Sequence, residues 1–221
     1  MEWAVLSGIP GEDVRELLSV ARRRRFDRHE VVFHDGDPAD SLHLIAKGRF
    51  GIRLTTRLGD EVLLDLLGPG DVFGELALVA TEPAPRAATV FALESAETHC
   101  IYRGDFERLR DRYPSIDRVL VTLLAEQLRR KDQRLLEAHF VDVDRRVVSR
   151  LLDLRRAYAA GSDQVTIPLT QDEVSALVGA TRPSVNKVLR ELQSRGVLEL
   201  HRGKIIILDA DALSRGVTRS A

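Results

Sequence analysis

The stretch that most constrains the fold is residues 170–190, TQDEVSALVGATRPSVNKVLR. Glu173 follows Thr170 by three residues, which is the pattern of a capping box at the start of a helix. Apolar residues at helical spacing come next, and Gly179 then interrupts them as a tight turn between two helices requires. Pro183 stands in the first turn of the second helix, where a proline costs no hydrogen bond. The stretch therefore predicts a helix-turn-helix.

The second of these helices divides into an apolar face and a polar face. The residues expected to pack inward are Val185, Val188, Leu189 and Leu192, and those left outside are Arg182, Ser184, Asn186, Lys187 and Arg190. Cationic and amide side chains on an exposed helix start are what reading of the DNA major groove requires. Residues 195–208 then predict two strands joined by a basic turn, His201-Arg202-Gly203-Lys204, which is a wing able to contact phosphate. The alternative, two short surface helices of an ordinary α domain, does not account for this wing.

Composition limits the class of protein. The chain has 221 residues, 44% hydrophobic and 30% charged, which fits a soluble globular protein of one large or two small domains. The single Cys100 excludes an internal disulfide and a four-cysteine iron–sulfur cluster within one chain, and no metal site is expected. The sequence shows no membrane-spanning run and no signal peptide, so we expect a cytoplasmic protein without a membrane partner.

Charge is divided unevenly along the chain, whose formal net charge is only −1. Residues 142–221 hold 13 Lys and Arg against 10 Asp and Glu, whereas residues 1–141 hold 20 against 24. Between residues 181 and 204 there are six basic and two acidic residues. A local positive field on an otherwise acidic chain is compatible with docking to DNA.

The first half of the chain has a different pattern. Residues 12–24 predict a short helix with the run Arg22–Arg25 at its end, which we interpret as a solvated face rather than a phosphate site. Residues 29–103 contain short apolar segments separated by glycine, which predict an all-β sandwich or roll.

A long helix is predicted from residue 114 to about residue 139. One side of it is apolar, with Ile116, Val119, Leu120, Leu123, Leu124 and Leu128, and Leu135 and Leu136 follow after a basic interruption. Part of this stripe must pack on the β domain of its own chain, and the rest predicts a seam with a second copy. A two-fold dimer would present two recognition helices to a palindromic site. Residues 140–144 are expected to form a hinge, and residues 145–158 the first helix of the C-terminal domain.

A second set of functional residues lies in the β region. Gly74 permits close approach of the backbone, Glu75 can accept a hydrogen bond from a ribose hydroxyl, and Arg86 can pair with a phosphate. A short helical turn after Glu75 would add N–H donors for an anion. The alternative is a structural salt bridge between Glu75 and Arg86, and spacing alone leaves both interpretations open.

Taken in order, these segments resemble the catabolite activator branch of the Crp/Fnr superfamily of transcription regulators, over roughly residues 10–210. The resemblance implies an α+β fold: a jelly-roll-like, cyclic-nucleotide-binding β-roll (residues 1–112), a long dimerisation helix with hinge (113–141) and a winged helix-turn-helix (142–221). It also implies cyclic AMP or another cyclic nucleotide as effector, double-stranded DNA and RNA polymerase as partners, and a homodimer. In such proteins the glutamate of the G-E-L motif binds the ribose and the following arginine binds the cyclic phosphate. These roles fall on Glu75 and Arg86, with backbone contributions from Gly74 and Leu76.

Two positions of the implied ligand site depart from the family pattern. Ala87 stands where a Ser or Thr usually adds a hydrogen bond to the phosphate, so only its backbone N–H remains. Lys131 and Asp132 stand where a Thr-Ser pair usually holds the adenine. This charged pair can hydrogen-bond a purine, favour another base, fill the pocket and make the protein independent of ligand, or point into solvent away from the seam.

The implied DNA-reading surface also departs from the pattern. An Arg-Glu pair usually opens the recognition helix, whereas this chain has Arg182-Pro183. Arg182 can still bind guanine, but Pro183 cannot accept a hydrogen bond from cytosine, so one half-site position is expected to be relaxed. The candidates for contact with DNA are Thr170, Gln171, Thr181, Arg182, Ser184, Asn186, Lys187, His201 and Lys204.

Other functions fit the sequence less well. A Crp/Fnr-type regulator that binds DNA without cyclic AMP, with Glu75 and Arg86 as a structural pair, is the nearest alternative. A redox or gas sensor would need the N-terminal cysteine cluster or a haem ligand, and the histidines are scattered along the chain. No nucleotide-hydrolase, zinc-protease or serine-hydrolase motif is present, so no enzymatic activity is expected.

Overall fold

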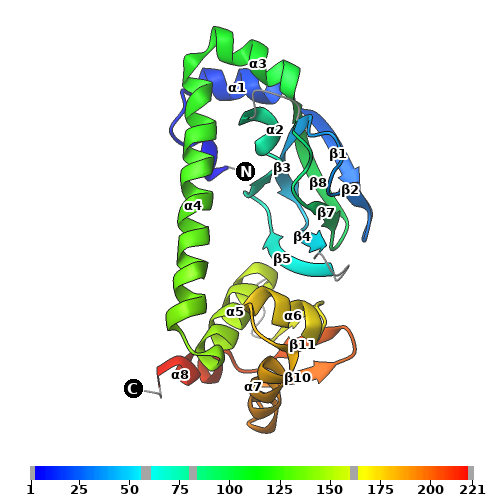
Figure 1. Ribbon diagram of the computed structural model, residues 1–221, viewed down its shortest axis with the longest axis vertical. Helices are drawn as coiled ribbons and strands as arrows, with labels where there is room; N and C mark the ends of the chain where they lie inside the picture. The colour runs from blue at the N-terminus through cyan, green and yellow to red at the C-terminus, as the bar shows by residue number, and fades with distance from the viewer. Residues whose placement is uncertain (1–2, 56–60, 80–83, 160–163, 219–221) are drawn as a thin grey trace. The chain divides into compact units, whose positions relative to one another are not determined.

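The computed structural model of the chain describes residues 3–55, 61–79, 84–159 and 164–218 (Figure 1). It contains two compact units, Met1–Lys131 and Asp132–Ala221. Helices and strands are both abundant, which confirms the expected α+β class. The boundary between the units falls within one long helix, and the predicted three-part division of the chain stays a prediction.

The first unit combines strands with helices at both of its sequence ends. Its strands are β1 (Arg22–Phe26), β2 (Val31–Phe33), β3 (Ser41–Lys47), β4 (Phe50–Thr55), β5 (Glu61–Leu67), β6 (Val72–Phe73), β7 (Thr89–Ala92) and β8 (Ala96–Tyr102). Its helices are the 3-10 turns η1 (Ala4–Leu6) and η2 (Pro114–Ile116), with α1 (Gly11–Ser19), α2 (Leu76–Val79), α3 (Arg103–Arg112) and the first part of α4 (Asp117–Phe140).

The strands form two four-stranded antiparallel sheets, in the orders β1-β8-β3-β6 and β2-β7-β4-β5. Aromatic and aliphatic side chains of both sheets meet in one core, which includes Phe26, Ile45, Phe50, Phe73 and Val90. This arrangement confirms the predicted β-roll. A second core cluster joins β3 to the helices and includes Trp3, Leu17, Phe106, Ile116 and Val119.

The helix predicted over residues 12–24 is too long. It ends at Ser19, and the arginine run lies in the edge strand β1, paired with β8. The four arginines are exposed, as expected of a solvated face, and Phe26 closes the strand by entering the core. Glu97 of β8 forms ion pairs with Arg23 and Arg25. The helix ends early because pairing with a distant strand outweighs the local helical pattern.

Helix α4 is the predicted long helix, and η2 precedes it as a separate turn. Val119, Leu120 and Leu123 are buried on its inner side. Other apolar side chains of this helix are exposed in the single chain, namely Val121, Leu128, Leu135, Leu136 and Phe140.

The second unit contains a helix-turn-helix and a small sheet. Its elements after α4 are α5 (Val143–Tyr158), β9 (Val165–Ile167), α6 (Gln171–Val178), α7 (Arg182–Ser194), β10 (Leu198–His201), β11 (Lys204–Ile207) and α8 (Ala210–Thr218). The strands pair in the order β10-β11-β9, so the predicted hairpin wing is confirmed and gains a third strand. The four residues of α7 expected to pack inward are all buried.

Candidate ligand and DNA-binding sites

Arg86 is the centre of the candidate ligand site. It lies just before β7 and is only 6% exposed. Its Nη1 donates to the Ser41 carbonyl oxygen (2.8 Å), and its Nη2 donates to the Ser41 hydroxyl (2.9 Å) and the Asp40 carboxylate (3.1 Å). The guanidinium also lies over the Phe33 ring, 4.0 Å from its centroid. Burial lowers the pKa of Arg86, and the Asp40 charge opposes this shift, so the group remains a buried cation.

Gly74 packs tightly against the Arg86 group. Its φ is +85°, and a Cβ at this position would lie 2.7 Å from the Ser41 carbonyl oxygen and 3.0 Å from Arg86 Nη1. Both the backbone angle and the space therefore require glycine. Glycine was expected at this position to permit close approach of the backbone, and here it does so, beside Arg86.

Glu75 is 8% exposed. The ion pair of Arg86 is formed with Asp40, so the alternative of a structural Glu75–Arg86 salt bridge is wrong. Within the ranges that the structure describes, no group donates a hydrogen bond to the Glu75 carboxylate. The Nε of Arg86 is buried without a hydrogen-bond partner. Both charged groups therefore keep hydrogen-bonding capacity that the described residues do not use.

Leu76 and Ala87, the other candidate ligand-site residues of this region, are more exposed. Leu76 begins the predicted short helix α2, and its side chain and that of Ala87 are exposed. The backbone N–H groups of Ala77 and Leu78 already donate to the carbonyl oxygens of Gly74 and Glu75. These two groups are thus not the anion donors expected from α2. Residues 80–83, which lie between Leu76 and Arg86 in the sequence, are outside the described residues.

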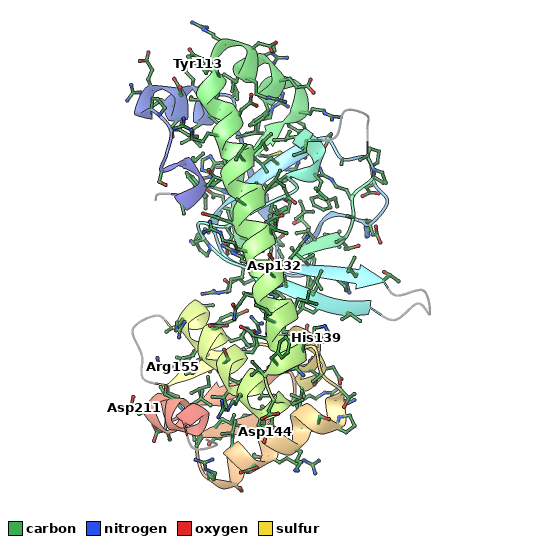
Figure 2. The ribbon with its side chains drawn as sticks, turned by 60° about the vertical axis from the view of Figure 1, so that its left-hand side comes forward. Tyr113, Asp132, His139, Asp144, Arg155 and Asp211 are labelled. Atoms are coloured by element: carbon green, nitrogen blue, oxygen red, sulfur yellow. The ribbon has the colours of Figure 1, made fainter. Side chains whose placement is uncertain are left out.

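Lys131 and Asp132 are both exposed on α4. Asp132 is labelled in Figure 2. Among the described residues, no hydrogen bond or ion pair joins either of them to Gly74, Glu75 or Arg86. Each lies three or four residues from the exposed Leu128 and Leu135, so helical geometry puts all four on neighbouring positions of one side of α4. This spacing disfavours the interpretation in which the charged pair points away from the apolar stripe.

The helix-turn-helix is built by the local signals that predicted it. Thr170 Oγ1 accepts from the Glu173 backbone N–H (3.1 Å), and the Glu173 carboxylate accepts from the Thr170 N–H (2.6 Å). Gly179 ends α6 with a left-handed φ of +67°. Thr181 precedes α7 in an extended conformation, and Pro183 lies in its first turn. The recognition helix therefore begins where the sequence indicated.

The candidate DNA-contact residues are mostly on the surface of this unit. Thr170, Thr181, Arg182, Ser184, Lys187, His201 and Lys204 are exposed, whereas Gln171 and Asn186 are half-buried. The Oδ1 of Asn186 is buried without a hydrogen-bond partner. On the wing, His201 Nε2 lies 2.9 Å from the Glu199 carboxylate. The exposed members of the set are free to reach a groove or a phosphate.

Three residues that sequence reasoning missed hold these sites together. Asp40 pairs with Arg86 and stands 46 residues before it, without a motif to connect them. Asp172 of α6 forms an ion pair with Arg182 of α7, with 2.9 Å between Oδ1 and Nε. Arg146 of α5 donates from Nη1 to the carbonyl oxygens of Val178 (3.0 Å) and Gly179 (3.1 Å), which braces the turn of the helix-turn-helix.

Comparison with known families assigns both units. Residues 23–113 match the cyclic nucleotide-binding domain, and residues 145–215 match the Crp-like helix-turn-helix domain. None of the helices among the described residues combines the length and hydropathy needed to cross a bilayer. Nor do those residues contain a group of three or more His, Cys, Asp or Glu side chains suited to a metal ion.

Related proteins agree with this assignment. The chain is 32% identical over 214 residues to a "CRP-like cAMP-activated global transcriptional regulator" of Mycobacterium tuberculosis, covering 96% of this chain and 95% of the relative. It is 33% identical over 206 residues to a "Cyclic AMP receptor protein" of Thermus thermophilus, covering 93% of each chain. The crystal structure of the Thermus thermophilus catabolite activator protein matches with a TM-score of 0.54 at 31% identity, covering 98% of this chain and 99% of that one.

A cyclic nucleotide-binding domain and a helix-turn-helix on one chain define a DNA-binding transcription regulator, not an enzyme. The chain belongs to the Crp/Fnr family of transcription regulators, as its sequence predicted.

Proposed function

We propose that this regulator is a cytoplasmic homodimer whose affinity for DNA is controlled by a cyclic nucleotide in the β-roll, with cyclic AMP as the first candidate. The observation that carries the proposal is the unused hydrogen-bonding capacity of Glu75 and Arg86. Buried polar groups are normally hydrogen-bonded, yet Arg86 Nε is buried without a partner, and the carboxylate of Glu75, a residue only 8% exposed, accepts no hydrogen bond from the described residues. A ribose hydroxyl and a cyclic phosphate supply the missing donor and acceptor.

The exposed stripe of α4 supports the dimer. Val121, Leu128 and Leu135 repeat at seven-residue intervals, which is the spacing of a two-stranded coiled coil. Lys131 lies between Leu128 and Leu135 at the intervening position of the same seam. In a dimer, Lys131 and Asp132 therefore come close to their counterparts in the partner subunit and border the base pocket that the resemblance implies.

The second unit supports sequence-specific reading of a palindromic operator. Arg182 and Lys187 lie exposed on α7, where a helix in the major groove presents its N-terminal half to the bases. Thr170, Gln171, His201 and Lys204 contact phosphates, which set the register of the protein on the duplex. We infer that the DNA-bound dimer acts on RNA polymerase, the partner that the family resemblance implies.

Control follows from linkage between the two sites. Ligand bound at Arg86 and at α4 must favour the arrangement of the DNA-binding units that fits successive major grooves. DNA must then raise the affinity for ligand by the same factor by which ligand raises the affinity for DNA.

The test is isothermal titration of the full-length protein with cyclic AMP, with cyclic GMP as control, for the parent and for the Glu75→Ala, Arg86→Ala and Arg108→Ala variants. Arg108 is exposed on α3 and serves as the matched arginine control. We expect binding by the parent and by Arg108→Ala, and a loss of at least tenfold in the other two, since each removes a hydrogen bond to a charged group worth about 1.5–3 kcal/mol. Glu75 has no partner to lose, so its variant separates ligand binding from folding. Equal binding by all four proteins would refute the site.

A ligand-independent regulator is the second candidate, and one observation favours it. Asp40 and Ser41 already accept hydrogen bonds from both terminal nitrogens of Arg86, and Ala87 offers no hydroxyl to a phosphate. DNA affinity measured by fluorescence anisotropy separates the two candidates. A ligand-independent regulator binds DNA with the same affinity with and without saturating cyclic nucleotide, whereas a ligand-controlled regulator does not.

A further inference from the structure

We propose that Asp172 is a positioning residue for DNA recognition: it holds Arg182 by its inner nitrogen and leaves the two terminal nitrogens to read a guanine. The proposal rests on the guanine-reading role of Arg182 proposed above. The two residues stand ten positions apart, one in the first turn of α6 and one at the first residue of α7. The helix-turn-helix brings them together across its turn, with 2.9 Å between Asp172 Oδ1 and Arg182 Nε.

The ion pair does little for the fold. The side chains of Arg182 and Asp172 are 62% and 59% exposed, and exposed ion pairs add little to stability because water and salt screen them. Asp172 also complements the positive end of α6, but Glu173 stands in the same turn and does so as well. Neither local effect requires the carboxylate to lie on the guanidinium of Arg182.

The geometry suits base reading. A guanine is bound through its O6 and N7 by two N–H groups of an arginine. Because the ion-pair contact is made at Nε, the Nη1 and Nη2 groups stay available, and in the described part of the chain Arg182 forms no other ion pair and no hydrogen bond. An arginine that is already oriented loses less side-chain freedom on binding than a freely rotating one. The restraint therefore strengthens the base contact selectively.

The charge of Asp172 adds a penalty against the wrong sequences. A carboxylate at the DNA-facing end of α6 repels phosphates, whatever the base sequence. Only a site with guanine in the correct position compensates for this repulsion through Arg182. Asp172 thus raises specificity by two routes. It also places a carboxylate beside Arg182, whereas the recognition helix itself has Pro183 at the position where the family usually has a glutamate.

The experiment measures specificity rather than affinity alone. The preferred duplex is selected from a randomised library with the full-length parent protein, in the presence of cyclic AMP and in its absence. Fluorescence anisotropy then gives the affinity of the parent, Asp172→Asn, Asp172→Glu, Arg182→Ala and the Asp172→Asn/Arg182→Ala double variant. The probes are this duplex, its single-base variants and a random-sequence duplex. Asp211→Asn, which removes an exposed carboxylate on α8, is the matched charge control.

We expect Asp172→Asn to lower the guanine preference at one half-site position by roughly 2- to 10-fold, the cost of immobilising one flexible side chain. The same variant should bind the random duplex more tightly, whereas Asp172→Glu should keep part of the preference and Asp211→Asn all of it. In the Arg182→Ala background the Asp172 substitution should leave base preference unchanged. Thermal unfolding should be the same for all variants.

Two results would overturn the inference while leaving Arg182 in its role. One is an unchanged base preference in Asp172→Asn, and the other is an equal loss of preference with and without Arg182. A different result, full guanine preference in Arg182→Ala, would refute the reading role of Arg182 itself. The failure of the inference and the failure of the proposed function are thereby distinguished.

Discussion

His43 makes the stability of the β-roll depend on pH. Its ring is 2% exposed, is stacked on Phe73 with 4.8 Å between ring centroids, and has its Nδ1 3.0 Å from the Thr98 hydroxyl. Burial, and then the nearby Arg86 and Arg24 charges, lower the pKa of His43 from 6.5 to about 3. The folded roll therefore holds this imidazole neutral under conditions in which the unfolded chain protonates it.

The free energy of unfolding should fall as the pH falls. Above about pH 6.5 the ring is neutral in both states and contributes no pH dependence. Below that value the unfolded chain gains a proton that the folded roll does not accept until about pH 3, and each pH unit costs about 1.4 kcal/mol. Between about pH 6.5 and about pH 5, the roll should lose about 2 kcal/mol through His43 alone.

Urea unfolding followed by tryptophan fluorescence can measure this loss. Trp3 is the single tryptophan of the chain, it is buried, and its Nε1 donates to the Ile45 carbonyl oxygen, so its emission reports on the unit that contains His43. The protein concentration is held constant because a dimer is stabilised by mass action. His43→Asn keeps a polar atom near the Thr98 hydroxyl and removes the titration, and His34→Asn, at an exposed histidine, is the control.

We expect the parent and His34→Asn to lose the same free energy between about pH 7 and about pH 5, and His43→Asn to lose about 2 kcal/mol less than either. The variant should be the less stable protein at neutral pH, since it gives up the ring stacking. Parallel pH dependence in the parent and in His43→Asn would show that the imidazole does not resist protonation, and would refute the reasoning.

Three further substitutions test the sites. Gly74→Ala forces a Cβ to within 2.7 Å of the Ser41 carbonyl oxygen at a left-handed backbone angle, so it should destabilise the first unit by about 1–3 kcal/mol and abolish nucleotide binding in a calorimetric titration. Arg146→Ala removes two hydrogen bonds to the turn after α6; we expect a loss of about 1–3 kcal/mol in thermal unfolding and weaker DNA binding, partly restored in Arg146→Lys. Leu128→Asp puts a charge in the proposed seam of α4 and should convert the dimer into monomers in light scattering, whereas the same change at the exposed Leu64 of β5 should not.

The parts of the structure that the sequence predicted well depend on local signals. The capping box at Thr170, the left-handed Gly179 and the apolar spacing of α7 each act within a few residues, so a short window contains all the information needed. The wing was equally local, since Gly203 turns one strand directly into the next.

The features that were missed depend on contacts between distant residues. The arginine run looked like the end of a helix, and only its pairing with β8 makes it a strand. Asp40 was missed as the partner of Arg86 because no motif or spacing in the sequence connects the two residues. The spacing was equally compatible with Glu75 as the ion-pair partner of Arg86. Asp172 could have been found from the motif, since a helix-turn-helix brings the start of its first helix near the start of its second.

The pairing of Arg86 with Asp40 and Ser41 bears on how such regulators evolve. If the buried charge of Arg86 were compensated only by a bound ligand, the domain would fold stably only in the presence of that ligand. Here the protein supplies a substitute carboxylate and two oxygens of its own, so the roll can fold before any nucleotide arrives. Descendants of this chain can therefore drift at Ala87, Lys131 and Asp132, exchange one effector for another, or lose the effector, and still inherit an intact scaffold that carries a DNA-binding unit.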